Sequence, residues 1–284
     1  MTQTLLTLLD WFLPIAYLAL WTVHARTFRL PLDQDRPTWL ERITGKIPLM
    51  IMLAIHAGYT ILRGLAQQAW PLSNKAEFFS LLALSILAVW LFTQRDEEDA
   101  QTGIFFLGIT ATFQIFACAL MIPIKDTTHP ILHENPIYGV HVLFMVLGFA
   151  ALAVGAIDAI MYILLARALK NREMGLVFQK LPPLIRIEET SKRATVTGIF
   201  LLGIGLSLGH IVALYGLDSV NPWDPKIVLT DLAWLAYIVG MITIKLKGLG
   251  GLRMGYLSLA AFIILMLTVA ISSLYLPSFH SFPG

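Results

Sequence analysis

Seven histidines are the side chains of this 284-residue sequence with the clearest capacity for chemistry. A neutral imidazole binds metal ions and haem iron, and an ionisable group at membrane depth is costly enough to suggest a function. The sequence has a single cysteine, Cys118, which excludes an internal disulfide, a thiol redox pair and a C-x-x-C-H haem attachment site. Any haem handled by this chain would therefore be bound non-covalently.

The composition indicates an integral membrane protein. Hydrophobic residues make up 57% of the sequence and charged residues 13%, and the mean hydropathy is +0.74. A soluble domain of this size could not bury so many apolar side chains, whereas a bilayer solvates them from outside. We therefore expect an all-α, polytopic protein with a single membrane domain over residues 1–284. Apolar stretches of spanning length predict about eight transmembrane helices, at about 4–23, 48–67, 77–94, 103–124, 138–166, 194–215, 227–246 and 254–275.

The distribution of Lys and Arg predicts which side of the membrane each loop faces. Of the 20 basic residues, all but Arg63, Lys75, Lys125 and Lys226 lie in the first, third, fifth and seventh loops. Cytoplasmic loops of multi-pass proteins carry the excess of positive charge. The sequence therefore predicts a protein of the cytoplasmic membrane with both termini and the even-numbered loops on the outer, periplasmic side.

Most of the histidines gather on that outer face. A bis-histidine haem site needs two imidazoles on opposite sides of the macrocycle, aromatic surface against the ring and polar donors for the propionates. The sixth loop contributes Trp223 and Asp224 on the same side. The outer face therefore contains the ingredients of a haem site. The outer histidines are His129, His133, His141, His210 and His280.

The same residue types also have structural explanations. Histidines at a membrane surface can be polar caps, and tryptophan belongs to the interfacial belt. His56, near the middle of the second helix, could bind a metal ion or form a hydrogen bond to another helix. Arg63, at the outer end of that helix, could pair with a haem propionate or extend to the lipid headgroups. His24, at the cytoplasmic end of the first helix, is expected to be an interfacial residue.

Three separated motifs resemble the CcsA (ResC) family of cytochrome c assembly proteins. Segment 69–83, AWPLSNKAEFFSLLA, is similar to that family's G-H-F-P-L-S-N-x-Y-E-S-L signature. Segment 221–238, NPWDPKIVLTDLAWLAYI, resembles its tryptophan-rich loop and the helix that follows. The ending LYLPSFHSF, at 274–282, resembles the family's L-L-x-x-G-L-H-S-Y. The resemblance is recognisable from about residue 50 to residue 284.

The resemblance implies a haem-handling role. Members of this family hold haem at the outer face beneath the tryptophan-rich loop, between two axial histidines, until an apocytochrome c takes it. His141 matches the first axial histidine and His280 the second, so these two would ligate the haem iron. Trp223 and Asp224 match the surviving part of the loop. The implied cofactor is non-covalent haem b, and the implied partners are a membrane subunit of the assembly system and apocytochrome c, with no nucleic acid.

Departures from the family pattern narrow this expectation. The full synthases carry a histidine near the inner end of the helix after the loop, as a ligand of a second haem within the membrane. Ile242 occupies that position here, which leaves His56 and His210 as candidates for such a site. The loop also has fewer tryptophans than the family motif, with Asn221 where the first tryptophan would be. These features and the short chain resemble the smaller HemX- and YpjD-like branch.

The sequence therefore supports one main hypothesis and two alternatives. The main hypothesis is a haem-binding and haem-transport protein of cytochrome c biogenesis that presents haem to a partner or to apocytochrome c. It would be at most one part of a holocytochrome c synthase, and no catalytic residue is assigned to it. The alternatives are a membrane-anchored b-type cytochrome subunit of a respiratory complex and a HemX-like, non-catalytic regulator of haem biosynthesis.

Overall fold

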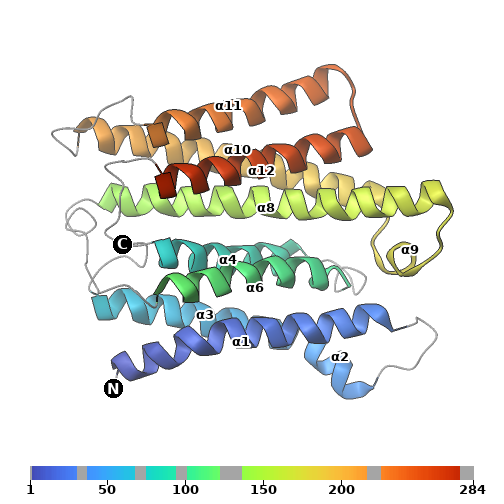
Figure 1. Ribbon diagram of the computed structural model, residues 1–284, viewed down its shortest axis with the longest axis horizontal. Helices are drawn as coiled ribbons and strands as arrows, with labels where there is room; N and C mark the ends of the chain where they lie inside the picture. Colours follow the sequence, from blue (N-terminus) through green and yellow to red (C-terminus); the bar gives the residue numbers. More distant parts are fainter. Residues whose placement is uncertain are drawn as a thin grey trace. The chain divides into compact units, whose positions relative to one another are not determined.

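All of the regular secondary structure is helical in the part of the chain that the computed structural model describes, residues 2–30, 37–67, 75–93, 101–121, 136–215 and 225–275 (Figure 1). Eight of these helices are long and apolar enough to cross a membrane, which confirms the expected polytopic all-α fold. They are α1 (Thr2–Arg29), α3 (Lys46–Gln67), α4 (Lys75–Thr93), α6 (Gly103–Met121), α8 (Pro136–Asn171), α10 (Leu184–Tyr215), α11 (Pro225–Leu246) and α12 (Leu252–Tyr275). Two short helices, α2 (Thr38–Thr44) and α9 (Leu176–Lys180), lie in the connections.

Helices α8 and α10 are longer than a bilayer requires. They contain 36 and 32 residues. At about 1.5 Å per residue each reaches roughly 50 Å, against about 30 Å of hydrocarbon. The apolar pattern predicts a start near residue 194 for the sixth span, but α10 begins at Leu184, directly after Pro182 and Pro183. The residues before 194 are mostly polar and charged, so hydropathy does not detect them although they continue the same helix.

The helices form two compact units. Unit 1 comprises α1, α2, α3, α4, α6, α9 and the last residues of α8, and unit 2 comprises residues 136–163 of α8 with α10, α11 and α12. In unit 1, α6 packs against α1 and α4, and α3 packs against the same two helices. In unit 2, α11 packs against α10 and α12. Each unit therefore has an interior of its own.

Aromatic side chains fill part of the interior of unit 1. Trp90 stacks on Phe106 with ring centroids 5.5 Å apart, and its indole N–H donates to Thr102 Oγ1 at 3.0 Å. Trp21 on α1 donates in the same way to the Ile104 carbonyl oxygen on α6, also at 3.0 Å. A buried indole needs such an acceptor, because its N–H loses its hydrogen bond to water on burial and would otherwise have no partner. These bonds therefore help to hold α1 and α4 against the start of α6.

Glycine brings α8 and α10 of unit 2 into close antiparallel contact. A Cβ atom on Gly148 would lie 2.8 Å from the backbone nitrogen of Leu202, so no other residue fits there without a shift. Small residues are the usual means by which membrane helices approach closely. The hydroxyl of Ser191 adds a polar bond across the same contact, donating to the Gly155 carbonyl oxygen at 2.8 Å. The two helices therefore have a defined register.

Two residues of the segment 221–238 join α11 to its neighbours. The indole N–H of Trp234 donates to the Ile199 carbonyl oxygen on α10 at 2.9 Å. The hydroxyl of Tyr237 lies 3.5 Å from the Ser258 carbonyl oxygen on α12. Part of the tryptophan-rich motif is thus used to hold helices together within unit 2.

We expect Gly148→Ala to lower the thermal unfolding midpoint of the protein in detergent, because the added methyl group pushes α8 away from the Leu202 backbone. Overpacking of this kind costs typically about 1–3 kcal/mol. Gly240→Ala on α11 is the matched control, since a Cβ there meets no atom within 4 Å and alanine is the better helix former. Circular dichroism measures both midpoints, and equal values for the two variants would contradict the close contact.

Candidate functional site

Four of the seven histidines lie within the described residues, and their ring nitrogens divide them into two kinds. His56 and His210 have partners at both nitrogens. Within the described residues, His24 and His141 have a hydrogen bond at Nδ1 and none at Nε2. A nitrogen engaged in a hydrogen bond is not available to a metal ion, so this division bears on the expected haem site. Other expected site residues lie outside the described part of the chain: His129, His133, Trp223, Asp224 and His280.

His141 lies in the second turn of α8, and its imidazole packs against α10. Its Nδ1–H donates to the carbonyl oxygen of Gly205 at 2.6 Å. A carbonyl oxygen only accepts, so this bond places the ring proton on Nδ1 and the lone pair on Nε2. A backbone carbonyl on the second ring nitrogen is a usual partner of a metal-binding histidine, because it fixes the tautomer and the ring orientation. His141 therefore has the geometry of an imidazole ligand.

The His141 ring lies on a glycine surface of α10. A Cβ atom on Gly209 would lie 2.7 Å from His141 Cε1 and 2.9 Å from its Nδ1. The ring can approach the Gly205 carbonyl because position 209 has no side chain. Tyr138, nearly one turn earlier on α8, lies with its ring centroid 5.9 Å from that of His141. Neither glycine was among the site residues expected from the sequence, although the carbonyl of Gly205 and the missing side chain of Gly209 make this contact.

His210 follows Gly209 on α10 and reaches α11. Its Nδ1–H donates to the Leu206 carbonyl oxygen of its own helix at 2.9 Å. Its Nε2 lies 3.2 Å from Oδ2 of Asp231, and the two side chains are 48% and 32% exposed. The pair links the last turns of α10 to the second turn of α11.

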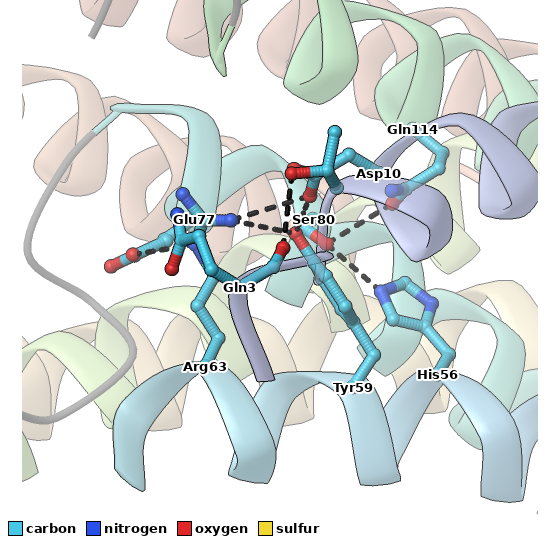
Figure 2. Close-up of polar contacts among 9 residues, drawn as sticks. Gln3, Asp10, His56, Tyr59, Arg63, Glu77, Ser80 and Gln114 are labelled. Atoms are coloured by element: carbon cyan, nitrogen blue, oxygen red, sulfur yellow. Dashed lines mark hydrogen bonds and ion pairs between the residues drawn. The ribbon is translucent and has the colours of Figure 1, made fainter. Parts of the chain in front are cut away.

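His56 is fully buried in unit 1 and forms a chain of hydrogen bonds. The hydroxyl of Tyr17 lies 2.8 Å from His56 Nδ1, and Ser80 Oγ lies 2.9 Å from Nε2. Ser80 in turn donates to Gln114 Oε1 at 3.1 Å (Figure 2). Because the single Ser80 proton goes to Gln114, Ser80 accepts from His56 Nε2–H, and Tyr17 then donates to Nδ1. This directed chain joins α1, α3, α4 and α6 and uses both nitrogens of His56.

A mostly buried ion cluster lies beside this chain, nearer the C-terminal end of α3 (Figure 2). The guanidinium of Arg63 lies 3.1 Å from Glu77 Oε1 and 3.3 Å from Asp10 Oδ1. The hydroxyl of Tyr59 donates to the same Asp10 oxygen. Arg63 therefore connects α1, α3 and α4, and it already has two carboxylate partners within unit 1.

His24, expected at the membrane interface, is buried among aromatic side chains of unit 1 and is 4% exposed. Its Nδ1–H donates to the Leu20 carbonyl oxygen at 2.9 Å, as His141 does to Gly205. Its ring meets Trp90 edge-to-face, and a Cβ atom on Gly103 would lie 2.6 Å from its Cδ2. Although Nε2 has no hydrogen-bond partner, these neighbours close it in. His24 therefore presents no open position for a large ligand.

The fold and these contacts define a polytopic helical membrane protein in which the His141 imidazole, near a helix end, has its hydrogen bond at Nδ1 and none at Nε2 among the described residues. The family model described as cytochrome c assembly protein matches residues 50–280, and the chain belongs to this family. The family resemblance expected from the three motifs is thereby confirmed. No solved structure matches the chain.

Named relatives agree with this assignment. The chain is 28% identical over 202 residues to the inner membrane protein YpjD of Escherichia coli (strain K12). The matched region covers 70% of this chain and 72% of the relative. It is 24% identical over 286 residues to the cytochrome c biogenesis protein CcsA of Crocosphaera subtropica, covering 80% and 83% of the two chains. The CcsA of Pyropia yezoensis is 24% identical over 251 residues, covering 74% and 78%.

We expect Ser80→Ala to destabilise unit 1 by about 1–3 kcal/mol, because it leaves the buried His56 Nε2–H without an acceptor. Cys118 on α6 is the single cysteine and is buried, so its reaction with a thiol-specific dye during heating reports the opening of this unit. The labelling temperature should fall in Ser80→Ala. The control is Ser207→Ala, whose exposed hydroxyl donates to the Gly203 carbonyl of its own helix. If both variants label at the wild-type temperature, the His56 chain does not stabilise the unit.

We also expect Arg63→Gln to destabilise unit 1, by about 3–5 kcal/mol, since removing one partner leaves buried carboxylates without their cation. The matched change is Arg193→Gln, which removes an exposed ion pair with Glu189 on one face of α10. Pairs of that kind contribute about 0–1 kcal/mol. Thermal unfolding in detergent compares the two variants. An equally small effect for both would contradict the description of Arg63 as a buried connector.

Proposed function

We propose that this protein binds haem at the outer face of the cytoplasmic membrane, with His141 and His280 as axial ligands, and presents it to apocytochrome c. The bond from His141 Nδ1–H to Gly205 carries this proposal, because it orients the ring and leaves Nε2 for iron. Membership of the cytochrome c assembly family implies haem handling and an encounter with apocytochrome c. The family match extends to residue 280, where the second ligand is expected.

The haem would be haem b, held without a covalent bond, because Cys118 is the single cysteine of the chain. A bound haem supplies an iron open to axial ligation and two vinyl groups that can form thioethers with the cysteines of an apocytochrome c. The residues of this chain would bind and orient it, which is the main contribution a protein makes to such chemistry. His141 would hold one axial position at a fixed ring angle. Trp223 and Asp224 would border the haem on the side offered to the partner.

In this proposal His56 and Arg63 stabilise unit 1 and do not contact haem. A haem ligated by His56 would have to break one of two hydrogen bonds to a fully buried ring. A propionate at Arg63 would have to compete with Glu77 and Asp10, which already lie against the guanidinium. This proposal therefore assigns both residues a structural role.

The cytoplasmic membrane is the proposed location, with both termini on the periplasmic side. The eight candidate spans and the excess of Lys and Arg in the odd-numbered loops support this arrangement. The relative YpjD is itself named an inner membrane protein. A membrane partner subunit would complete the assembly system around this chain.

The same His141 geometry also suits a resident haem, as in a b-type cytochrome, so transfer is the property to test. Co-expression of an apocytochrome c with and without this chain separates the two functions. Haem attached to the apocytochrome c only when the chain is present supports delivery. Haem that stays on this chain and changes only its oxidation state supports the cytochrome.

We expect His141→Ala and Gly209→Ala both to lower the haem content of the purified protein. The first removes a ligand. The second keeps the imidazole but places a methyl group where the ring lies, so the bond to Gly205 is lost; loss of such support typically costs about 10- to 100-fold in metal affinity.

Visible spectra and the pyridine haemochrome assay measure the haem in each variant. Gly240→Ala is the control, because its added methyl group meets no atom within 4 Å. If the wild type carries no haem, or if both variants bind haem as the wild type does, His141 is not a haem ligand.

A further inference from the structure

A short turn joins α11 to α12 in unit 2 (Figure 1). Gly248 has the left-handed φ of +58°, and the Leu249 N–H donates to the Ile244 carbonyl oxygen at 2.9 Å. This is the pattern with which a glycine closes the end of a helix. The 22 residues of α11 rise about 1.5 Å each, so the turn lies roughly 30 Å from the other end of α11, which pairs with His210.

This turn is fixed against two other helices of unit 2. The Gly251 N–H donates to Glu188 Oε1 on α10 at 3.3 Å. Gly251 also has a left-handed φ of +65°, and a Cβ atom there would lie 2.9 Å from the hydroxyl oxygen of Tyr162 on α8. The backbone of the turn therefore lies directly against α8 and α10, and the Glu188 carboxylate is held by that backbone.

Three exposed basic side chains lie on or beside this turn, and none of them has an ion-pair partner within the described residues. They are Lys245, Lys247 and Arg253. Two nearby acids have other partners, since Glu188 accepts from the backbone of the turn and Glu189 pairs with Arg193 on α10. The turn therefore holds positive charge that an anion from outside the chain can meet.

Both helices of this hairpin present an exposed apolar face that ends at the turn. The face comprises Val239, Ile242 and Leu246 on α11 and Leu257, Ile264 and Leu267 on α12. The α12 residues follow Arg253 at intervals of four, seven and three, so the cation and these side chains share one side of the helix. Both helices are candidate membrane spans. An apolar face that crosses the bilayer and ends in cations matches the acyl chains and the anionic headgroup of a phospholipid.

We propose that the α11–α12 turn binds the headgroup of an anionic phospholipid, whose acyl chains lie along the apolar face of α12. The phosphate accepts charge-assisted hydrogen bonds from Lys247 and Arg253, and Lys245 adds positive charge beside them. Basic residues next to a membrane span attract anionic lipids in this way. The fixed turn makes this a site and not a general basic surface, because no loop has to be ordered when the lipid binds. This lipid site does not depend on the proposed haem site.

The test is a titration of the purified, delipidated full-length chain with phosphatidylglycerol in detergent. Native mass spectrometry measures the fraction of protein that carries one lipid and so gives an apparent dissociation constant. The double variant Lys247→Gln/Arg253→Gln should weaken binding roughly 30-fold, since each basic residue at an anionic headgroup contributes roughly a factor of five. The matched control is Lys192→Gln/Arg193→Gln, which removes two exposed cations from α10 in the same unit and should change the affinity far less.

Two further ligands separate a phospholipid site from simpler explanations. Phosphatidylethanolamine with the same acyl chains carries no net charge, and inorganic phosphate carries no acyl chain. Neither should displace phosphatidylglycerol from the wild type at an equal concentration. If phosphatidylethanolamine binds as tightly as phosphatidylglycerol, the headgroup charge is not recognised and the proposal is wrong. If inorganic phosphate displaces the lipid, the turn is an anion site that needs no acyl chains, which also overturns it.

The variants decide between a defined site and diffuse attraction. Equal weakening by the two double variants would mean that positive charge attracts the lipid without a site, and the proposal would fall. Circular dichroism without lipid checks that each variant unfolds at the wild-type temperature. If Arg253→Gln alters folding, Lys245→Gln/Lys247→Gln takes its place, and unchanged affinity in that variant would likewise overturn the proposal.

Discussion

A polar group inside a bilayer must find its partner within the protein, because no water is there to replace it. Among the described histidines, this constraint explains why the nitrogens of His56 and His141 have different partners. His56 meets a hydroxyl at each nitrogen and is built into the interior of unit 1. His141 lies close enough to a helix end that one nitrogen can be left for a ligand, while the other is held by the protein. The two histidines therefore differ in the hydrogen-bond partners of their ring nitrogens.

The partner of His141 is a backbone carbonyl, and only close helix packing makes it available. A carbonyl within a helix normally accepts from its own chain, but its oxygen has a second lone pair. The second lone pair of Gly205 can be reached from α8 because at successive points along the contact one of the two helices has a glycine. Met145 lies against Gly205, and Gly148 lies against Leu202. The packing that holds unit 2 together is thus also what orients the proposed ligand.

The helices were predictable from composition and hydropathy alone, because spanning a bilayer demands long apolar stretches and leaves few other folds. His141 was proposed as a ligand from the family resemblance and from its place at a helix start. Gly205 and Gly209 were not found, because a glycine in a membrane helix has many uses and the sequence does not show what faces it. Arg63 and Glu77 were visible as charges in or beside apolar stretches. Their pairing depends on how α1, α3 and α4 pack together, and that packing cannot be read from the pattern of one sequence.

The antiparallel register of α8 and α10 is carried by the helices themselves. Successive partners run in opposite directions along the chain, from Met145 with Gly205 to Leu152 with Gly198. The connection between the two helices, residues 172–183, therefore has no part in placing His141 over its carbonyl. Such a connection can become longer or shorter without disturbing the contact between His141 and Gly205. In this chain it carries α9, which packs on α1 within unit 1.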